Sequence, residues 1–304
     1  RFQEDVQLMK LAGLTHYRTS INWSRFLTDY ENVTVDEEYA AYYDQLFDAL
    51  LANGITPMIC LEHYELPGYL LEKYGGWGSK TVVELFVRYA EKVFARYHPK
   101  VTRWFTFNEP IVVQTRVYLD ALRWPYEQNT STWMQWNYHK VLATASVVKR
   151  FRELGYPGTV GCILNPEVTY PRSRAPHDLR AAEIYDLFYN RMFLDPLVHG
   201  VWPPELLALL EQHQVTWETS EEDLAVIREH TVDELGINLY YPHRVKAPSR
   251  AWHPHTPFHP AWYYEPFELP GRRMNASRGW EIYPQIIFDM AMRIKNDYRN
   301  IPWF

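Results

Sequence analysis

Hydrophobic and polar positions follow two distinct patterns along the chain, and together these patterns predict helices that alternate with strands. The stretch "KTVVELFVRYAEKVFARY", residues 80–97, has apolar residues every three or four positions, as on one face of a helix. The stretch "ITPMICL" within residues 55–63 is instead apolar throughout, as expected for a strand covered on both faces. No hairpin signals separate the strands, so the pattern predicts parallel strands with helical crossovers.

The same criteria divide the rest of the chain. Helices are predicted over residues 2–12, 36–53, 80–97, 136–154, 178–193, 205–212 and 284–298. Strands are predicted over residues 17–23, 55–63, 101–109, 158–165, 234–241 and 301–304, and residues 247–266 are predicted to form a long loop. No glycine-rich phosphate loop follows a strand, so this α/β pattern favours a single (β/α) barrel domain over residues 1–304 rather than a doubly wound sheet.

Composition limits the kinds of partner that the protein can bind and the cellular compartments that suit it. The net charge of −6 argues against a nucleic-acid surface, which would be basic. No stretch approaches the roughly 18 apolar residues of a membrane span. Cys60 and Cys162 both lie in apolar, strand-like runs and are predicted to be free, buried thiols in a reducing compartment. The 12 Trp and 23 Tyr suit a pocket that stacks hydroxyl-rich ligands, although such residues also fill large cores.

Polar residues stand at the ends of the predicted strands. Asn108 and Glu109 follow the strand-like run "WFTF", and Pro110 ends that strand because proline cannot donate to a sheet ladder. Other such residues are Arg18, His63, Asn165, Asn238 and Tyr240. Taken singly, each is more often structural. In a barrel the strand ends converge on one mouth, and a ring of amide, imidazole, phenol and carboxyl groups there suits the hydroxyls of a sugar.

A carboxyl group in such a ring suggests glycosidic bond cleavage, which takes two acids. Glu109 is the candidate for the acid that protonates the leaving oxygen, and a retaining enzyme places the second carboxyl group about 5–5.5 Å away. His253, His255 and His259 have spacing that could suit a metal, but no carboxylate or cysteine beside them completes a ligand set. The chemistry therefore predicts neither a metal nor an organic cofactor.

Five stretches of the chain resemble, in order, landmarks of the family 1 glycoside hydrolases: "YRTSINWSRF", "LEHYELPGYLLEKYGGW", "WFTFNEP", "ELGINLYY" and "RGWEIYP". The resemblance implies a (β/α)8 TIM barrel and a retaining double displacement by two glutamates. The stretches "EKYGGW" and "NEPIVV" resemble the bacterial 6-phospho-β-glucosidase branch, which implies a small phosphorylated β-glucoside as substrate and a cytoplasmic enzyme. A plain β-glucosidase or β-galactosidase is the alternative within the family.

The resemblance also assigns roles to residues in the first three stretches. It implies that Glu109 is the acid/base and that Asn108 binds the 2-hydroxyl of the sugar. It implies that His63 binds the 3-hydroxyl, although the usual "HWDLP" reads "HYELP" here. It further implies that Arg18 orients the nucleophile.

Three more residues receive roles from the later stretches. Tyr240 matches a second residue that orients the nucleophile, and Asn238 matches an amide that lines the site, although the usual "NYY" reads "NLYY". Trp280 matches a residue that stacks on the far sugar, and a place in the core is the alternative for it.

The resemblance places the nucleophile, a glutamate of an "ENG" motif, beyond Phe304. By the family's count, strands 2–6 are complete, strand 7 is begun, and strands 1 and 8 are absent, so we expect a domain truncated at both ends. A non-catalytic, sugar-binding fragment of the same barrel is the alternative function. Transfer to an acceptor sugar in place of water, and an oligomeric assembly, are both compatible with the sequence.

Overall fold

The computed structural model describes residues 2–251 and 256–304. Contacts between residues divide the chain into two compact units. Unit 1 consists of Arg1–Pro110, His139–Ile163 and Val232–Gly236, and unit 2 of Ile111–Tyr138, Leu164–Thr231 and Ile237–Phe304.

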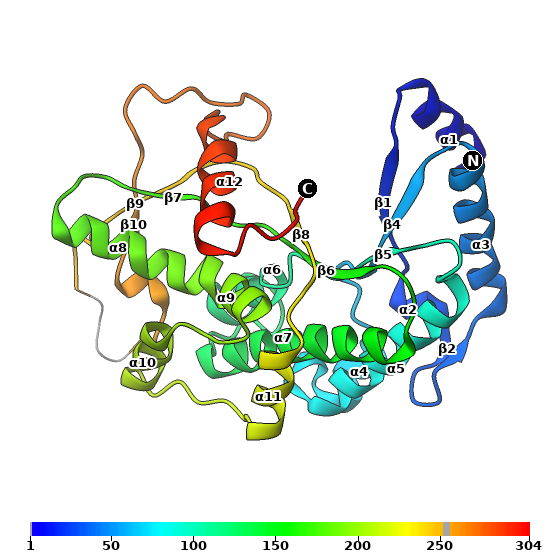
Figure 1. Cartoon of the computed structure of the whole chain (residues 1–304). Coiled ribbons are helices and arrows are strands. Elements are labelled where there is room, and N and C mark those ends of the chain that lie inside the picture. Colours follow the sequence, from blue (N-terminus) through cyan, green and yellow to red (C-terminus); the bar gives the residue numbers. More distant parts are fainter. Residues whose placement is uncertain (1, 252–255) are drawn as a thin grey trace. The chain divides into compact units, whose positions relative to one another are not determined.

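A five-stranded sheet, mainly in unit 1, has the order β1-β4-β5-β6-β8 (Figure 1). Its strands are β1 (His16–Ser20), β4 (Thr56–Glu62), β5 (Arg103–Asn108), β6 (Thr159–Leu164) and β8 (Leu235–Ile237). The pairs β1/β4, β4/β5 and β5/β6 are parallel, which confirms the predicted parallel pairing. Their carboxyl ends therefore lie at the same edge of the sheet, as the sequence predicted.

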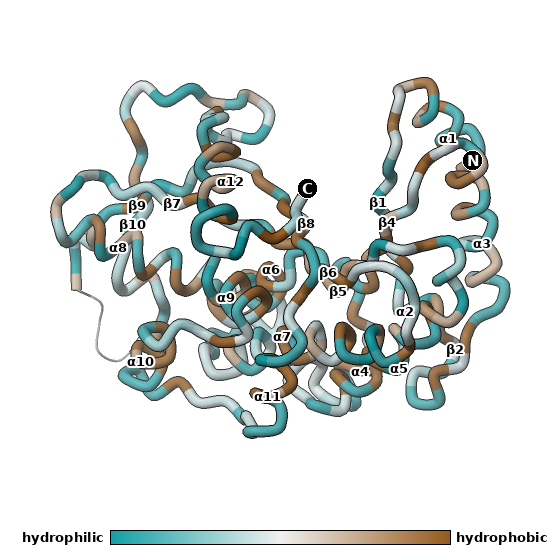
Figure 2. The backbone as a smooth tube through the Cα atoms, in the orientation of Figure 1, coloured by the Kyte–Doolittle hydropathy of each residue, from teal (hydrophilic) through white to brown (hydrophobic). Residues whose placement is uncertain are grey.

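Long helices accompany this sheet. They are α1 (Phe2–Leu11), α3 (Glu37–Ala52), α5 (Lys80–Tyr97) and α7 (Thr130–Leu154), of which α7 belongs to unit 1 from His139 onward. Asp36 caps α3 by accepting a hydrogen bond from the backbone of Tyr39 at 2.9 Å, and Ser79 caps α5 in the same way. Figure 2 shows hydrophobic and hydrophilic positions alternating along α5, whose apolar face is buried.

Short elements complete unit 1. They are α2 (Trp23–Phe26), β2 (Leu27–Asp29), β3 (Thr34–Val35), α4 (Gly68–Tyr74) and η1 (Gly76–Gly78). Buried aromatic rings link them to α5 and β5. The Trp23 ring stacks on Tyr89 at 5.4 Å, and Phe86 stacks on Phe107 at 5.0 Å. Such pairs contribute about 0.5–1.5 kcal/mol each beyond the burial of their area. This aromatic core supports the carboxyl end of β5, where Asn108 and Glu109 lie.

Unit 2 contains a smaller sheet of order β10-β9-β7. Its strands are β7 (Thr169–Pro171), β9 (His243–Lys246) and β10 (Glu265–Pro266); β7 and β9 are parallel, and β9 and β10 are antiparallel. Its helices are α6 (Val112–Gln114), α8 (Pro176–Asp186), α9 (Met192–His199), α10 (Pro204–Gln212), α11 (Glu221–Glu229) and α12 (Gln285–Asp297), with π-helical turns η2 (Thr115–Leu119) and η3 (Leu187–Arg191) and the short η4 (Pro260–Trp262).

Most predicted elements are confirmed, but several boundaries were wrong. The strand predicted to run to residue 23 ends at Ser20, and the strand predicted to run to residue 241 ends at Ile237. The helix predicted from residue 136 begins at Thr130. The region predicted as helix 178–193 is part of α8, η3 and α9, which follow one another without a break.

Other elements were missed or overpredicted. Helix α11 was missed, although Ser220 caps it by accepting from the backbone of Asp223 at 3.1 Å. The predicted loop over residues 247–266 contains η4 and β10. Residues 301–304 form no named strand, but the carbonyl of Phe304 accepts a hydrogen bond from Ile237 at 3.0 Å. Among the described residues, no helix combines the length and apolar character that crossing a membrane requires.

Candidate active site

The carboxyl ends of β1 and β5 are joined by a hydrogen bond between two of the predicted site residues. Arg18 lies on β1, Asn108 ends β5, and β4 runs between them in the sheet. The Arg18 Nη1 donates to Asn108 Oδ1 at 2.8 Å. Asn108 is buried, and a buried side-chain amide with a charged donor has a fixed orientation. The amide NH₂ of Asn108 is therefore presented in a defined direction.

Glu109 follows directly and is held by contacts on both its backbone and its side chain. Its N–H donates to the carbonyl of Ile163 at 2.7 Å, which extends the pairing of β5 with β6. Its side chain, only 7% exposed, accepts a hydrogen bond at Oε2 from the Tyr64 hydroxyl. Glu109 and Tyr64 both have left-handed backbones, with φ of +49° and +73°. Such conformations are costly for residues other than glycine and cluster at functional sites.

His63 lies beside this carboxyl group. Its ring packs edge-on against Tyr64 at 5.0 Å, and its backbone N–H donates to Glu65 Oε2 at 2.8 Å. Partial burial, together with the positive charge of Arg18, lowers the pKa of the imidazole. His63 is therefore neutral at pH 7 and carries one donor and one acceptor, which is the pair that a sugar hydroxyl needs.

The ionisable side chains of the buried Glu62 and Lys140 and of the partly buried Glu65 accompany these strand ends. Burial raises the pKa of Glu62, and burial together with the Glu62 charge raises the pKa of Glu65 to about 7. Lys140, 1% exposed on α7, donates from Nζ to the carbonyl of Pro110 at 3.0 Å. Burial lowers the pKa of this ammonium group, and the carboxylate of Glu62 opposes that shift. Lys140 was not among the predicted site residues, because a lysine within a helix is usually exposed.

The other three predicted residues lie in unit 2. The backbone N–H of Asn238, which directly follows β8, donates at 2.8 Å to the carbonyl of Leu164, the last residue of β6. Tyr240, half exposed, contacts the Trp280 ring with the ring centres 5.5 Å apart. Tyr241 stacks on the same indole at 5.1 Å. The structure therefore groups Tyr240 with Trp280, and their roles toward a nucleophile or a sugar stay predictions.

No metal site accompanies these groups in the part of the chain that the structure describes. Residues 2–251 and 256–304 contain no cluster of three or more His, Cys, Asp or Glu side chains that could hold a metal ion. His253 and His255 lie outside the described residues, and the Nδ1 of His259 accepts a hydrogen bond from the backbone of Ala261. Cys60 and Cys162 are free and buried, as the sequence predicted.

A second buried cluster, in unit 2, consists of Glu167, Tyr185 and His243. The Tyr185 hydroxyl donates to Glu167 Oε2 and lies 2.8 Å from His243 Nδ1. Because a hydroxyl has one hydrogen, His243 Nδ1 donates to the Tyr185 oxygen. Burial lowers the pKa of His243 to about 4, although the Glu167 carboxylate lies 3.3 Å away. The imidazole is therefore neutral over the usual working range of pH.

This lowered pKa predicts acid sensitivity of folding. In the unfolded chain a histidine has a pKa of about 6.5, so the unfolded state binds the proton first as the pH falls. The contribution of the neutral His243 to the free energy of unfolding is therefore fully present above pH 6.5 and is lost as the pH falls toward 4. We expect the free energy of unfolding of the wild type to fall by about 2–3 kcal/mol more between pH 7 and pH 4.5 than that of H243Q. Urea titrations at both pH values test this, with the exposed His177→Gln as control; equal losses in wild type and H243Q would contradict it.

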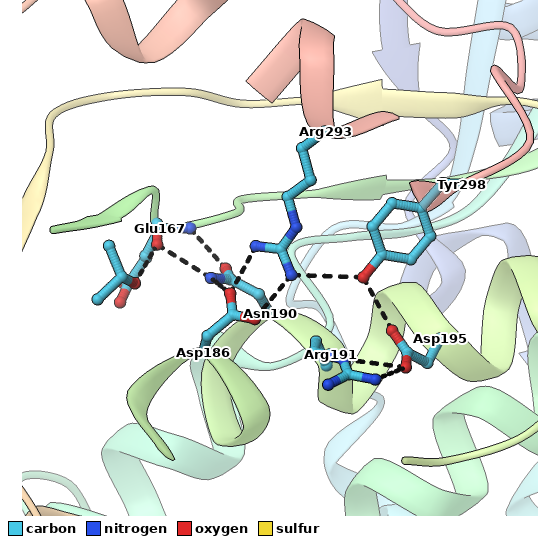
Figure 3. Close-up of polar contacts among 8 residues, drawn as sticks. Glu167, Asp186, Asn190, Arg191, Asp195, Arg293 and Tyr298 are labelled. Carbon is cyan, nitrogen blue, oxygen red and sulfur yellow. Dashed lines mark hydrogen bonds and ion pairs between the residues drawn. The ribbon is translucent and has the colours of Figure 1, made fainter. Parts of the chain in front are cut away.

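Asn190, on the π-helical turn η3, holds the backbone beside that cluster. Its side chain accepts from the N–H of Glu167 at 2.7 Å and donates to the carbonyl of Glu167 at 3.0 Å, which copies the pairing of a neighbouring strand. Figure 3 shows Arg293 of α12 reaching both Asp186 and Tyr298. Tyr298 in turn donates to Asp195 at 2.8 Å. These contacts hold the segment that follows β6 to η3, and they hold α12 and Tyr298 to α8 and α9.

The sequence is similar to those of known glycosidases over its whole length. It is 39% identical over 303 residues to the 6-phospho-beta-glucosidase GmuD of Bacillus subtilis, covering 100% of this chain and 65% of that protein. It is 31% identical over 299 residues to Beta-glucosidase A of Acetivibrio thermocellus, covering 98% of this chain and 64% of that protein. The chain thus spans just under two thirds of the length of these relatives.

The fold is similar to those of solved family 1 glycosidases. The family 1 β-glucosidase of Thermotoga maritima superposes with a TM-score of 0.85 at 28% identity, covering 98% of this chain and 64% of that one. The parallel strands and their helices are thus part of a TIM-barrel fold, as the sequence predicted. The family described as Glycosyl hydrolase family 1 matches residues 1–304. The chain therefore belongs to glycosyl hydrolase family 1.

Proposed function

We propose that the protein is a retaining β-glycosidase in which Glu109 is the general acid and then the general base. The observation that carries this proposal is the buried carboxyl group of Glu109. It lies at the carboxyl end of a parallel strand and accepts a hydrogen bond from the Tyr64 hydroxyl. Asn108 beside it is oriented by Arg18. Membership of a glycosidase family supports the same reaction class.

The proposed chemistry has two steps. Glu109 gives its proton to the glycosidic oxygen while a second carboxylate attacks the anomeric carbon, so that the leaving alcohol departs and a glycosyl ester forms. Glu109, now ionised, then takes a proton from water as the water oxygen attacks the same carbon and releases the carboxylate. We assign the second carboxylate, from the resemblance, to a glutamate beyond Phe304, and the described strands β1, β4, β5, β6 and β8 to family strands 2–6.

The proposed substrate is a small β-glucoside, phosphorylated at the 6-position. The relative named 6-phospho-beta-glucosidase is 39% identical, whereas the relative named Beta-glucosidase A is 31% identical. His63 and Asn108 would bind sugar hydroxyls, Asn238 would line the site, and Tyr240 with Arg18 would orient the nucleophile. Two free, buried cysteines support a cytoplasmic location, where such phosphorylated sugars occur.

Activity of the full-length protein on p-nitrophenyl β-glucoside and on its 6-phosphate tests this proposal. We expect kcat/KM to be at least about tenfold higher for the 6-phosphate, because a buried phosphate contact is worth more than about 1.4 kcal/mol. NMR should show the β-anomer as the first product. Preference for the unphosphorylated glucoside would indicate a plain β-glucosidase. Sugar binding without turnover of either compound would favour the non-catalytic alternative.

A further inference from the structure

Trp280, Tyr240 and Tyr241 form an aromatic wall in unit 2, and a buried ion pair lies directly next to it. Glu281 follows Trp280 in the chain, and Arg244 of β9 binds Glu281 through two nitrogens. Arg244 Nη2 lies 2.7 Å from Glu281 Oε1, and Arg244 Nε lies 2.9 Å from Oε2. The two side chains are only 11% and 9% exposed. Such a fork fixes both position and orientation, which a single contact does not.

The guanidinium group of Arg244 is enclosed by aromatic rings as well. Its central carbon lies 5.2 Å from the centre of the Tyr170 ring and 4.9 Å from that of Tyr283. A lysine has no planar fork and stacks less well, so it cannot replace arginine at this position without loss. Glu281 and Tyr283, which follow Trp280 in the chain, are therefore anchored to β9 through one side chain.

The position of Trp280 in the wall depends on the Arg244–Glu281 ion pair. Tyr241 lies two residues before β9 and Arg244 lies within it. The Trp280 ring stacks on Tyr241 and the Glu281 carboxylate binds Arg244, so two neighbouring residues are held by the same segment. Tyr241 in turn stacks on His243 at 4.7 Å, and His243 belongs to the buried cluster with Glu167 and Tyr185. One edge of the wall is thus fixed by stacking and the other by the ion pair. If the ion pair is lost, Trp280 keeps its ring contacts, the Arg278 guanidinium over its ring and the hydrogen bond from the Asn275 N–H to its carbonyl, but the residue that follows it loses its salt bridge to β9.

We propose that Arg244, acting through Glu281, is the positioning residue for the Trp280 indole of the aromatic wall and thereby determines affinity for the aglycone. This inference rests on the proposed function. The wall offers flat, apolar faces with one half-exposed phenol, which suits an aryl group or the apolar face of a second glucose. Arg244 does not touch the substrate, and it acts by holding the indole where the aglycone binds.

The test compares two substrates that share the sugar and differ in the leaving group. An aryl β-glucoside has a ring to stack, whereas a β-glucosyl fluoride has none, and both carry the 6-phosphate if the enzyme requires it. For R244K in the full-length protein we expect KM for the aryl glucoside to rise about tenfold, with kcat and both constants for the fluoride unchanged. R180K serves as the matched control, because Arg180 forms an exposed ion pair with Glu205 in the same unit.

A double variant and a second single variant complete the test. W280A should raise the aryl KM similarly, and R244K/W280A should raise it no further than W280A alone, because the two residues act as one unit. If R244K does not fold, E281Q carries the same expectation. Equal loss on both substrates, or no change on the aryl glucoside, would overturn the proposal. Failure of the wild type to cleave either substrate would instead refute the proposed function.

Discussion

Replacement of Glu109 by glutamine is expected to slow hydrolysis of an alkyl β-glucoside by about 10²–10⁴-fold in kcat/KM, the usual contribution of general acid–base catalysis. Glutamine keeps the shape of the side chain and an oxygen that can accept from Tyr64, so the site stays assembled. It cannot supply the proton that an alkoxide leaving group needs. A dinitrophenyl glucoside needs no such proton, so its first step should slow far less.

Chemical rescue provides the sharper measurement. In E109A a small anion such as azide fits the space of the missing carboxylate and attacks the glycosyl ester directly, with no need for a general base. We expect azide to accelerate turnover of the dinitrophenyl substrate and to give a β-glucosyl azide. E65Q is the matched control, because it also removes a partly buried carboxyl group near the site. Full activity of E109Q on alkyl glucosides would exclude Glu109 as the acid.

The second large effect is expected at Lys140. K140M should lower the free energy of unfolding by about 3–5 kcal/mol, because Glu62, only 2% exposed, would lose the positive charge that stabilises its ionised form. The variant also removes the donor to the carbonyl of Pro110, next to Glu109. Urea unfolding of the full-length protein, followed by tryptophan fluorescence, measures this loss.

The double variant separates the buried charge from the packing. E62Q/K140M removes both charges, so it should recover at least half of the stability lost in K140M. Lys149 lies on the same helix with its side chain 47% exposed, and K149M should cost no more than about 0.5 kcal/mol. A loss in K140M as small as that in K149M would show that the Lys140 charge does not compensate Glu62.

The sequence predicted the elements whose signals are local. Helix α5 begins at Lys80, as the pattern predicted, and α3 begins at Glu37, one residue after its predicted start. The boundaries that were wrong depend on tertiary packing. Trp23 has strand-like neighbours in the sequence, yet it lies in α2 because its ring is buried against Tyr89 and Phe86. In α11 the acidic first turn after Ser220 was a signal, but its apolar stripe is short.

The candidate site shows the same division. Asn108 and Glu109 could be predicted because a strand end and a following proline are visible in seven residues, "WFTFNEP". Contacts across the chain could not be predicted. The Tyr64–Glu109 hydrogen bond joins residues 45 positions apart, and the Arg244–Glu281 pair joins residues 37 positions apart. Neither spacing corresponds to a helix or strand period, so only the fold brings these partners together.

At Glu109 the left-handed backbone conformation costs stability, whereas the carboxyl group is the one that the proposed reaction needs. Glycine adopts its φ of +49° at no steric cost, and asparagine tolerates it better than glutamate does. Selection for heat resistance alone would therefore favour, at position 109, residues that relax the backbone and lack a carboxyl group. On the proposed assignment of Glu109 as the acid/base, selection on the reaction is what keeps a glutamate there, so the identity of this residue in a descendant sequence records whether catalysis was still under selection.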